Sequence, residues 1–368
     1  MSTRVAITGL GAKTPAGATV RESFTAVSNG KSLARRIDAL CDADVTVPIA
    51  AVVPEFDRDR YFSKRERLGL DRTAQLGLAA AIDAASDSGL AMDQLGERCG
   101  VFAGIGGVAT CGTAESVTTS RIRTGRRLGP FTVPMLMPSA TAARIGLRLG
   151  VTGPALTYAT ACASGSTAIG EALRAIRSGA LDAVLAGGAE SGVTPLVIEG
   201  FAQIGALSRR TDDPAGASRP FDQDRDGFVM GEGAAFLVLE SWDRAAARGA
   251  RIYAELAGYG SNSDAYHIVA PDPGGGRAAR CVAAALADAR LDPADIGHVN
   301  AHGTATVRND DAEAAALASC FGPAIPPVTA TKGITGHMIG GAGAFEAVMT
   351  VLTVRHGWVP PVANFHRW

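Results

Sequence analysis

The chain has 368 residues, 47% of them hydrophobic, and its 35 basic and 36 acidic side chains nearly cancel. This balance argues against a nucleic-acid-binding surface, and no apolar run reaches the roughly 18 residues that a membrane span requires. The six cysteines form no Cys-x-x-Cys pair, which is typical of reduced thiols. We therefore expect a cytoplasmic protein without a signal peptide, and without nucleic acid or membrane as a partner.

Hydrophobic periodicity predicts alternating strands and helices along the first half of the chain. We expect strands at 4–8, 100–103, 155–161, 181–187 and 236–239, and helices at 71–88 and 164–177. Gly9-Leu10-Gly11 is expected to close the first strand, and the strand 155–161 is expected to be buried. The run Gly104-Ile105-Gly106-Gly107 resembles part of a dinucleotide-binding loop, but the resemblance is weak because no helix pattern opens directly on it. Residues 111–138 are interpreted as a long excursion.

The second half repeats the first in outline. A helix at 277–290 and a strand at 298–301 copy the order of residues 71–103. The segment 326–333 and the helix at 341–356 then parallel the strand and helix on either side of Cys162. This duplication predicts an α/β fold of two similar βαβ-rich halves whose strand ends meet at one site. A strand follows the helix in the first half, whereas the matching strand of the second half is missing.

Cys162 lies at the predicted corner between the strand 155–161 and the helix 164–177, and only small residues flank it. The free N–H groups and the dipole of a helix N-terminus stabilise a thiolate, so we expect this cysteine to be nucleophilic near neutral pH. Small neighbours leave room for a substrate carbonyl. A buried core cysteine is the alternative that this segment alone favours.

Three further segments carry candidate catalytic residues: 262–267 with Asp264, 300–306 with His302, and 331–337 with Lys332 and His337. Either histidine alone is better explained as a core residue. In the duplicated arrangement, however, His302 and Lys332 both fall at strand ends that face Cys162. One thiol and two imidazoles at one site suit acyl transfer followed by carbanion chemistry.

Five motifs together resemble those of one known family, in order and in spacing. They are Thr-Ala-Cys-Ala-Ser-Gly at 160–165, Leu-Ala-Gly-Gly-Ala-Glu at 185–190, Pro-Phe-Asp-Gln-Asp-Arg-Asp-Gly-Phe-Val-Met-Gly-Glu-Gly at 220–233, Asn-Ala-His-Gly-Thr at 300–304 and Thr-Lys-Gly-Ile-Thr-Gly-His at 331–337. The chain resembles a β-ketoacyl-acyl carrier protein synthase of the thiolase superfamily. The resemblance is to the type II elongating ketosynthases of fatty-acid and polyketide synthesis.

This resemblance implies a thiolase-like fold with layers in the order α-β-α-β-α, an N-terminal half at 1–248 and a C-terminal half at 249–368 that lacks its last strand or strands. It also implies that Cys162 takes an acyl group from a carrier thioester. His302 and His337, kept neutral by burial, would stabilise the enolate formed when malonyl-carrier loses carbon dioxide. The supporting residues that it implies are Lys332 paired with Glu346, Asp264 as a brace, and Thr304 and Thr306 on the pantetheine arm.

The same resemblance implies acyl carrier protein as a partner, no metal, and no cofactor beyond the phosphopantetheine arm of the carrier. It further implies a homodimer, or a heterodimer with a chain-length-factor-like ketosynthase. The basic runs at 63–67 and 121–127, with Lys64, Arg67 and Arg127, are candidate docking patches for the acidic carrier and equally ordinary solvated faces.

The family normally continues through a Gly-Phe-Gly-Gly segment that this sequence lacks, and that segment supplies one donor of the oxyanion hole. The alternative function is therefore a non-condensing or degraded carrier-binding subunit of a ketosynthase heterodimer. The presence of Cys162, His302, Lys332 and His337 favours the condensing enzyme, because a scaffold has no use for all four.

Overall fold

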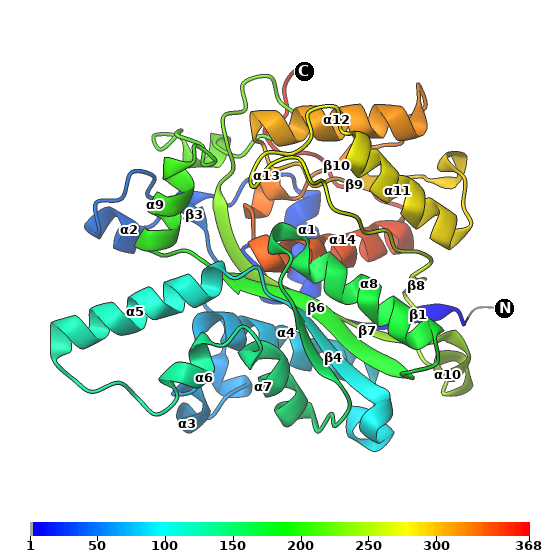
Figure 1. Cartoon of the computed structure of the whole chain (residues 1–368), viewed down its shortest axis with the longest axis horizontal. Helices are drawn as coiled ribbons and strands as arrows, with labels where there is room; N and C mark the ends of the chain where they lie inside the picture. The colour runs from blue at the N-terminus through cyan, green and yellow to red at the C-terminus, as the bar shows by residue number, and fades with distance from the viewer. Residues whose placement is uncertain (1–2) are drawn as a thin grey trace.

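Two β-sheets and three layers of helices organise the chain in a computed structural model that describes residues 3–368 (Figure 1). The strands are β1 (Val5–Lys13), β2 (Arg35–Arg36), β3 (Ile49–Ala51), β4 (Cys99–Gly104), β5 (Ala155–Tyr158), β6 (Ala183–Ser191), β7 (Met230–Ser241), β8 (Ala254–Glu255), β9 (Val299–Asn300) and β10 (Val328–Thr329). The helices are α1 (Val20–Ser28), α2 (Asp38–Asp42), α3 (Lys64–Arg67), α4 (Arg72–Ser88), α5 (Val108–Thr124), α6 (Thr132–Leu136), α7 (Ala140–Leu149), α8 (Ser164–Arg177), α9 (Pro195–Gln203), α10 (Trp242–Ala247), α11 (Gly276–Ala289), α12 (Val307–Phe321), α13 (Lys332–Thr335) and α14 (Ala342–His356). None of these described helices is long and apolar enough to cross a lipid bilayer.

The large sheet has the strand order β2-β3-β7-β6-β4-β5, and β1 pairs with β7 and β8. Strands β5, β4 and β6 are parallel, whereas β7 is antiparallel to both β6 and β1. Both faces are buried along β6, where Leu185 packs in the core cluster of α4 and α7 and Val184 in the cluster of α8 and α14. Burial on both faces explains why this strand is continuously apolar in the sequence.

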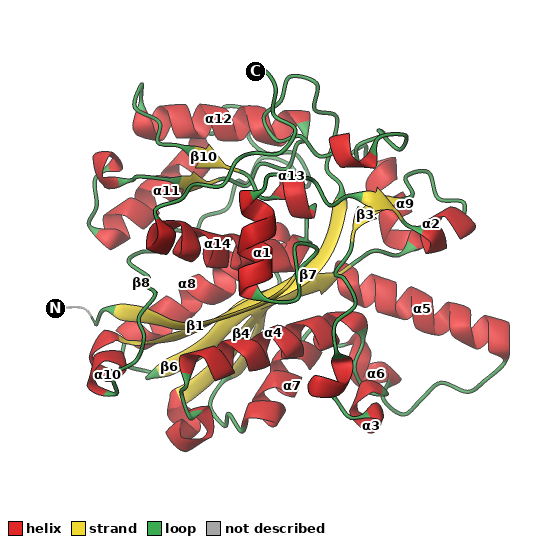
Figure 2. Cartoon of the chain, turned by 180° about the vertical axis from the view of Figure 1, so that it is seen from behind, coloured by secondary structure: helices red, strands yellow, loops and turns green. Residues whose placement is uncertain are grey.

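The layers follow the predicted α-β-α-β-α order (Figures 1 and 2). Helices α4 and α7 cover one face of the large sheet, and α8 and α14 cover the other. The small sheet of β9 and β10 lies beyond α14, since the Asn300 amide donates to the Glu346 carbonyl at 3.1 Å. Helices α11 and α12 form the outer layer. Side chains that follow strands of both sheets can therefore meet at the middle layer.

The first predicted helix is confirmed, but the end predicted for the first strand is wrong. Helix α4 begins after Asp71, whose side chain accepts from the Ala74 N–H at 2.9 Å, as an N-cap does. Strand β1 continues through Gly9 and Gly11 to Lys13 rather than turning. A Cβ on Gly11 would lie 2.0 Å from the Ala80 carbonyl oxygen, so these glycines permit a close approach of α4 to the strand.

Two other expectations near the site are corrected. Strand β5 is exposed or half-exposed rather than buried, because it is an edge strand that pairs with β4 alone. Residues 111–138 are not an irregular excursion, since α5 opens at Val108 directly after the glycine run and α6 follows. Among the α5 residues only Ala109 and Gly112 are buried, so the helix lacks the apolar periodicity that identifies a packed helix from sequence.

The second half forms the repeated elements in shorter versions. Helices α11 and α14 and strands β9 and β10 occur at the predicted positions, and β9 and β10 are parallel. Within residues 3–368 the small sheet contains these two strands, and no strand is assigned after α14. The missing strand of the second half stays a prediction.

Candidate active site

Cys162 projects from a strained turn between β5 and α8. Residues Ala161–Ala163 form a single 3-10 turn, and Ala161 has φ +49°, a left-handed conformation that disfavours residues with a Cβ. The buried Ser164 hydroxyl ties the turn together, since it donates to the Ala161 carbonyl at 2.7 Å and accepts the Thr160 N–H at 2.9 Å. Ser164 thus has a structural role, and the turn directs the Cys162 thiol toward the second half of the chain.

His302 lies in the loop that follows β9. Gly303 has φ +43°, and a Cβ there would lie 2.6 Å from the Ala330 side chain, so only glycine fits this turn. The Glu313 carboxylate of α12 accepts the backbone N–H of His302 at 2.6 Å and of Gly303 at 2.8 Å. Burial raises the pKa of Glu313, while these two hydrogen bonds oppose the rise. Glu313 was not among the residues predicted from the sequence.

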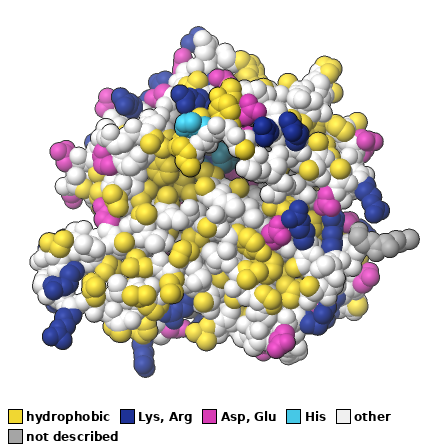
Figure 3. All heavy atoms as spheres, in the orientation of Figure 1, with side chains coloured by type: hydrophobic (Ala, Val, Ile, Leu, Met, Phe, Trp, Pro, Cys, Tyr) yellow, Lys and Arg dark blue, Asp and Glu magenta, His cyan; other side chains and the backbone are white. Residues whose placement is uncertain are grey.

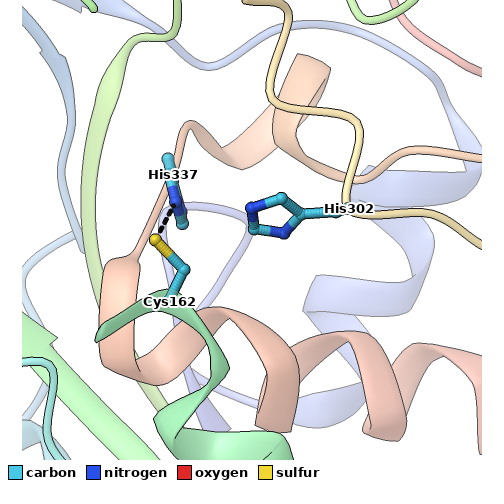
Figure 4. Close-up of side chains that lie close together, drawn as sticks. All are labelled: Cys162, His302 and His337. Atoms are coloured by element: carbon cyan, nitrogen blue, oxygen red, sulfur yellow. Dashed lines mark hydrogen bonds between the residues drawn. The ribbon is translucent and has the colours of Figure 1, made fainter. Parts of the chain in front are cut away.

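His337 is held on both sides by backbone contacts. Its N–H donates to the Val229 carbonyl at 2.8 Å, and its carbonyl accepts the Gly231 N–H at 2.9 Å, which fixes it to β7 and the residue before it. Its Nδ1 accepts the Ile339 N–H at 3.2 Å. Because Nδ1 is an acceptor, the proton of the neutral ring is on Nε2. His337 Nε2 lies 3.0 Å from Cys162 Sγ (Figure 4).

The two imidazoles lie edge to face beside the thiol (Figure 4). The ring centroids of His302 and His337 are 5.4 Å apart, with an interplanar angle of 85°. Burial lowers the pKa of both histidines well below the usual value, and the positive charge of Lys332 lowers it further. Both rings are therefore neutral near pH 7 and available as hydrogen-bond donors.

Lys332 and Glu346 form the ion pair that the sequence predicts. Lys332 is 1% exposed at the start of α13, and its ammonium group contacts the Glu346 carboxylate of α14. The Ser218 hydroxyl also donates to the Lys332 carbonyl at 2.8 Å. A buried ammonium group with one carboxylate partner is a fixed positive charge in a low-dielectric site.

The expected pKa shift of Cys162 is wrong in direction. Burial raises the pKa of the Cys162 thiol, and the charge of Lys332 opposes that rise without reversing it. The sequence indicated only the helix terminus, which stabilises the thiolate, and not the depth of the turn within the protein. Burial therefore opposes ionisation of the thiol, whereas the helix terminus and Lys332 favour it.

The thiol and the two imidazoles could also be considered as metal ligands, because their nearest ligand atoms all lie within 4.8 Å of one another. A metal would need an unprotonated nitrogen on His337 facing the site. The Ile339 N–H instead places the proton on that nitrogen. The arrangement suits hydrogen-bond donation to a developing negative charge better than coordination of a cation.

A cavity of about 590 Å³ leads from the surface to Cys162, His302 and His337 (Figure 3, the hollow with histidine at its edge). Thr304 and Thr306 line it and share a hydrogen bond of 2.9 Å between their hydroxyls. Asp264 also lines the cavity, where its carboxylate accepts the Asp272 N–H at 2.8 Å and closes a loop. Asp264 thus lies at the wall, apart from the contact between Cys162 and His337.

The predicted docking residues lie outside this cavity. Lys64 is exposed on α3, Arg67 pairs with Asp59, and Arg127 is exposed after α5. Arg121, Arg126 and Arg127 of the second basic run line a surface hollow of about 630 Å³, together with Leu68, which follows the first run. Lys64 and Arg67 do not line that hollow, and none of the three docking residues lines the cavity of Cys162.

A thiol, two neutral imidazoles and a buried lysine at the junction of two α/β halves define an acyl-transfer centre on a thiolase-like fold. Residues 2–245 match the family described as Beta-ketoacyl synthase, N-terminal domain, and residues 253–366 match Beta-ketoacyl synthase, C-terminal domain. The chain belongs to the β-ketoacyl synthase family.

Individual relatives agree along almost the whole chain. The "3-oxoacyl-[acyl-carrier-protein] synthase 2" of Synechocystis is 39% identical over 366 residues, covering 98% of this chain and 88% of the relative. The Vibrio cholerae protein of the same name is 40% identical over 367 residues with the same coverage. Among solved structures, "The ishigamide ketosynthase/chain length factor" has TM-score 0.92 and 34% identity over 100% of this chain and 90% of that one. An AntDE:AntF complex, described as a type II PKS acyl-carrier protein with its hexaketide-bound ketosynthase, has TM-score 0.90 and 32% identity over 100% and 90%.

Proposed function

We propose that this protein is a 3-oxoacyl-acyl carrier protein synthase, an acyltransferase that extends a fatty-acid or polyketide chain by decarboxylating condensation. The relatives at about 39% identity carry this activity in their names. The observation that carries the proposal is the contact between Cys162 Sγ and a His337 ring whose proton is fixed on Nε2. The Cys162 thiol is thus placed as a nucleophile, and the His337 Nε2–H next to it is placed as a hydrogen-bond donor to an enolate.

In the first half-reaction, Cys162 Sγ attacks the thioester carbonyl of an acyl-carrier. The new bond is an acyl-cysteine thioester, and the pantetheine thiol leaves with the proton that Cys162 loses. The free amide N–H groups at the N-terminus of α8, directly after the Cys162 turn, are assigned to stabilising the oxyanion of this carbonyl. The positive charge of Lys332 favours the thiolate against burial.

In the second half-reaction, the free carrier has left, and the phosphopantetheine arm of malonyl-carrier binds in the same cavity. The Nε2–H of His337 and the imidazole of His302 donate to the thioester oxygen, which carries the charge when the carboxylate leaves as carbon dioxide. The enolate carbon then attacks the acyl-Cys162 carbonyl. A carbon–carbon bond forms, the Cys162 thiolate leaves, and the product is a β-ketoacyl thioester on the carrier. Burial and the positive charge of Lys332 keep the histidines neutral, and the Lys332–Glu346 pair is assigned to positioning their rings.

The substrates arrive on an acyl carrier protein, whose phosphopantetheine arm supplies the only prosthetic group that this chemistry uses. Thr304 and Thr306 are assigned to that arm, and Asp264 to bracing the loop beside it. Lys64, Arg67 and Arg127 are assigned to docking the acidic carrier, because they are basic and at least partly exposed. The six free cysteines support a cytoplasmic location.

A dimer through β5 is part of this proposal, because β5 is an exposed edge strand beside the Cys162 turn. The partner is an identical chain or a chain-length-factor-like ketosynthase, as in the ishigamide structure. The alternative of a non-condensing carrier-binding subunit is not favoured, since all four catalytic side chains are present and are brought together.

Mass spectrometry tests the first half-reaction. The protein is mixed with an acyl-carrier thioester, and its intact mass and peptide map are measured. We expect one acyl-sized increase on the peptide that contains Cys162, and none in the Cys162→Ala variant. A folded protein that takes no acyl group, or takes it equally well after Cys162→Ala, would contradict the proposed function.

A further inference from the structure

Another cavity in the described part of the chain lies away from the catalytic one. It has a volume of about 690 Å³, within the range of small-molecule sites, and shares no lining residue with the cavity of Cys162. Its walls come from β1, α1, α4, the end of α14 and the segment before β8. Figure 2 shows α1 in front of the sheet with α4 below it and α14 beside it.

The floor of this cavity is apolar and its wall is basic. Leu10, Val20, Phe24 and Leu352 supply aliphatic and aromatic surface. Four arginines and two aspartates provide the charged groups of the lining: Arg21, Arg60, Arg251, Arg355, Asp83 and Asp87. The excess of positive charge beside apolar surface suits a ligand with an anionic head and an apolar body.

Both aspartates are already engaged by the protein. Asp83 contacts the buried Lys13 ammonium group and accepts the Tyr61 hydroxyl at 3.0 Å. Asp87 pairs with Arg251 and accepts the Leu10 N–H at 3.0 Å and the Tyr253 hydroxyl at 2.9 Å. Neither carboxylate is left to neutralise a further arginine.

Two arginines of the wall therefore lack an acidic partner. Within residues 3–368, the guanidinium groups of Arg21 on α1 and Arg355 on α14 have no hydrogen-bond or ion-pair partner. The Arg355 guanidinium lies 5.4 Å from the centroid of the Tyr253 ring, and His356 stacks on Phe24 at 5.2 Å between centroids. The aromatic contacts hold Arg355 and its neighbour at the cavity, where a guanidinium can bind a carboxylate or a phosphate in two-pronged fashion.

We propose that this cavity is a second ligand site, which binds an amphiphilic anion through Arg21 and Arg355 and buries its aliphatic body against Phe24 and Leu352. The head is a carboxylate or a phosphomonoester, because both match a guanidinium pair. The simplest alternative is that Arg355 only complements the dipole at the C-terminus of α14. That role predicts an effect on stability without any on ligand binding.

Calorimetric titration distinguishes the two roles. Decanoate, decyl phosphate and uncharged decanol are titrated into the wild type, into Arg21→Gln/Arg355→Gln, and into the control Arg280→Gln. Arg280 is an exposed arginine on α11, away from the cavity. We expect at least one anion to bind the wild type and the control, with the better of the two identifying the head group. The double variant should bind it at least about tenfold more weakly, since a hydrogen bond to a charged group contributes about 1.5–3 kcal/mol.

A photoreactive decanoate carrying a diazirine locates the site without any substitution. Labelling of peptides that contain residues 20–25 or 352–356 supports the proposal, even in protein acylated on Cys162. Labelling confined to peptides near Cys162 overturns it, as does decanol binding as tightly as the anions or no loss in the double variant. Acylation of Cys162 is measured in the same samples, so failure of this second site is distinguishable from failure of the proposed catalysis.

Discussion

The ion pair of Lys332 and Glu346 gives the sharpest prediction about the site. Lys332 is 1% exposed and Glu346 is 14% exposed, so Lys332→Met leaves a carboxylate nearly buried without its partner. Removing one member of a buried pair costs about 3–5 kcal/mol, whereas replacing both members by neutral groups is often close to neutral. We therefore expect Lys332→Met to lose a large part of a total stability of about 5–15 kcal/mol. The double variant Lys332→Met/Glu346→Gln should recover most of that loss.

Urea unfolding of the wild type and of the single and double variants measures these differences. The same variants also test the electrostatic role of Lys332, because its charge opposes the rise of the Cys162 pKa. Alkylation of Cys162 by iodoacetamide, followed against pH, should move to higher pH in Lys332→Met, and by a smaller amount in the double variant, because Glu346 itself raises the pKa of Cys162. The reasoning is refuted if Lys332→Met is as stable as the wild type, if the double variant is no more stable than the single one, or if the alkylation profile does not move.

Three further predictions concern protonation, packing and the His302 loop. Because the folded-state pKa values of His302 and His337 are lowered, only the unfolded chain takes up these protons below about pH 6.5. Their contribution to stability is therefore present above that pH and is lost as the pH falls, by up to about 1.4 kcal/mol per pH unit for each histidine. The free energy of unfolding in urea should therefore depend less on pH in His302→Gln/His337→Gln than in the wild type. An unchanged slope would contradict this prediction. Burial raises the pKa of Glu190 to about 7, so Glu190 acts in the opposite direction, and it does so in both proteins. Gly11→Ala should lower the free energy of unfolding by at least about 1–3 kcal/mol, because its Cβ would lie 2.0 Å from the Ala80 carbonyl oxygen. Gly129→Ala should change the free energy of unfolding little, because its Cβ would meet no atom within 4 Å. Equal stability of these two variants would argue against the close approach of β1 and α4. Glu313→Gln loses one acceptor of the His302 and Gly303 N–H groups, so His302 is less well positioned. Condensation should fall by up to about 100-fold while Cys162 is still acylated. A loss of acylation alone would place Glu313 elsewhere in the mechanism.

Much of the fold follows from local patterns in the sequence. Helix α4 and helix α8 have clear apolar periodicity and end at Gly89 and at Ser178-Gly179, so their positions are predicted closely. The duplication also predicts that the Cys162 turn and the His302 loop meet. These features depend on spacing that is visible within a window or between two repeats.

Features that depend on distant packing were not predictable in the same way. The length of β1 depends on the approach of Ala80 and Ala84 to Gly9 and Gly11, and glycines alone indicate a turn equally well. The exposure of β5 depends on the order of strands in the sheet, which an apolar run does not specify. Helix α5 buries too few residues to give a periodic signal.

The residues of the site likewise divide into those that local motifs predict and those that depend on distant packing. Cys162, His302, Lys332 and His337 stand in recognisable motifs, and the pairing of Lys332 with Glu346 was predicted. Glu313 acts on the His302 loop from eleven residues along the chain, and its acidic side chain at the surface of a helix gives no distinct signal. The burial that raises the Cys162 pKa likewise depends on the whole fold.

The most direct test of the central claim is to measure condensation itself. Purified protein is given an acyl-carrier and malonyl-carrier, and carbon dioxide and β-ketoacyl-carrier are quantified together by trapping and by mass spectrometry. We predict equal amounts of both products in the wild type, and loss of both after His337→Ala although Cys162 is still acylated. Acylation of Cys162 without any β-ketoacyl-carrier in the wild type would contradict the assignment of this chain as a condensing enzyme.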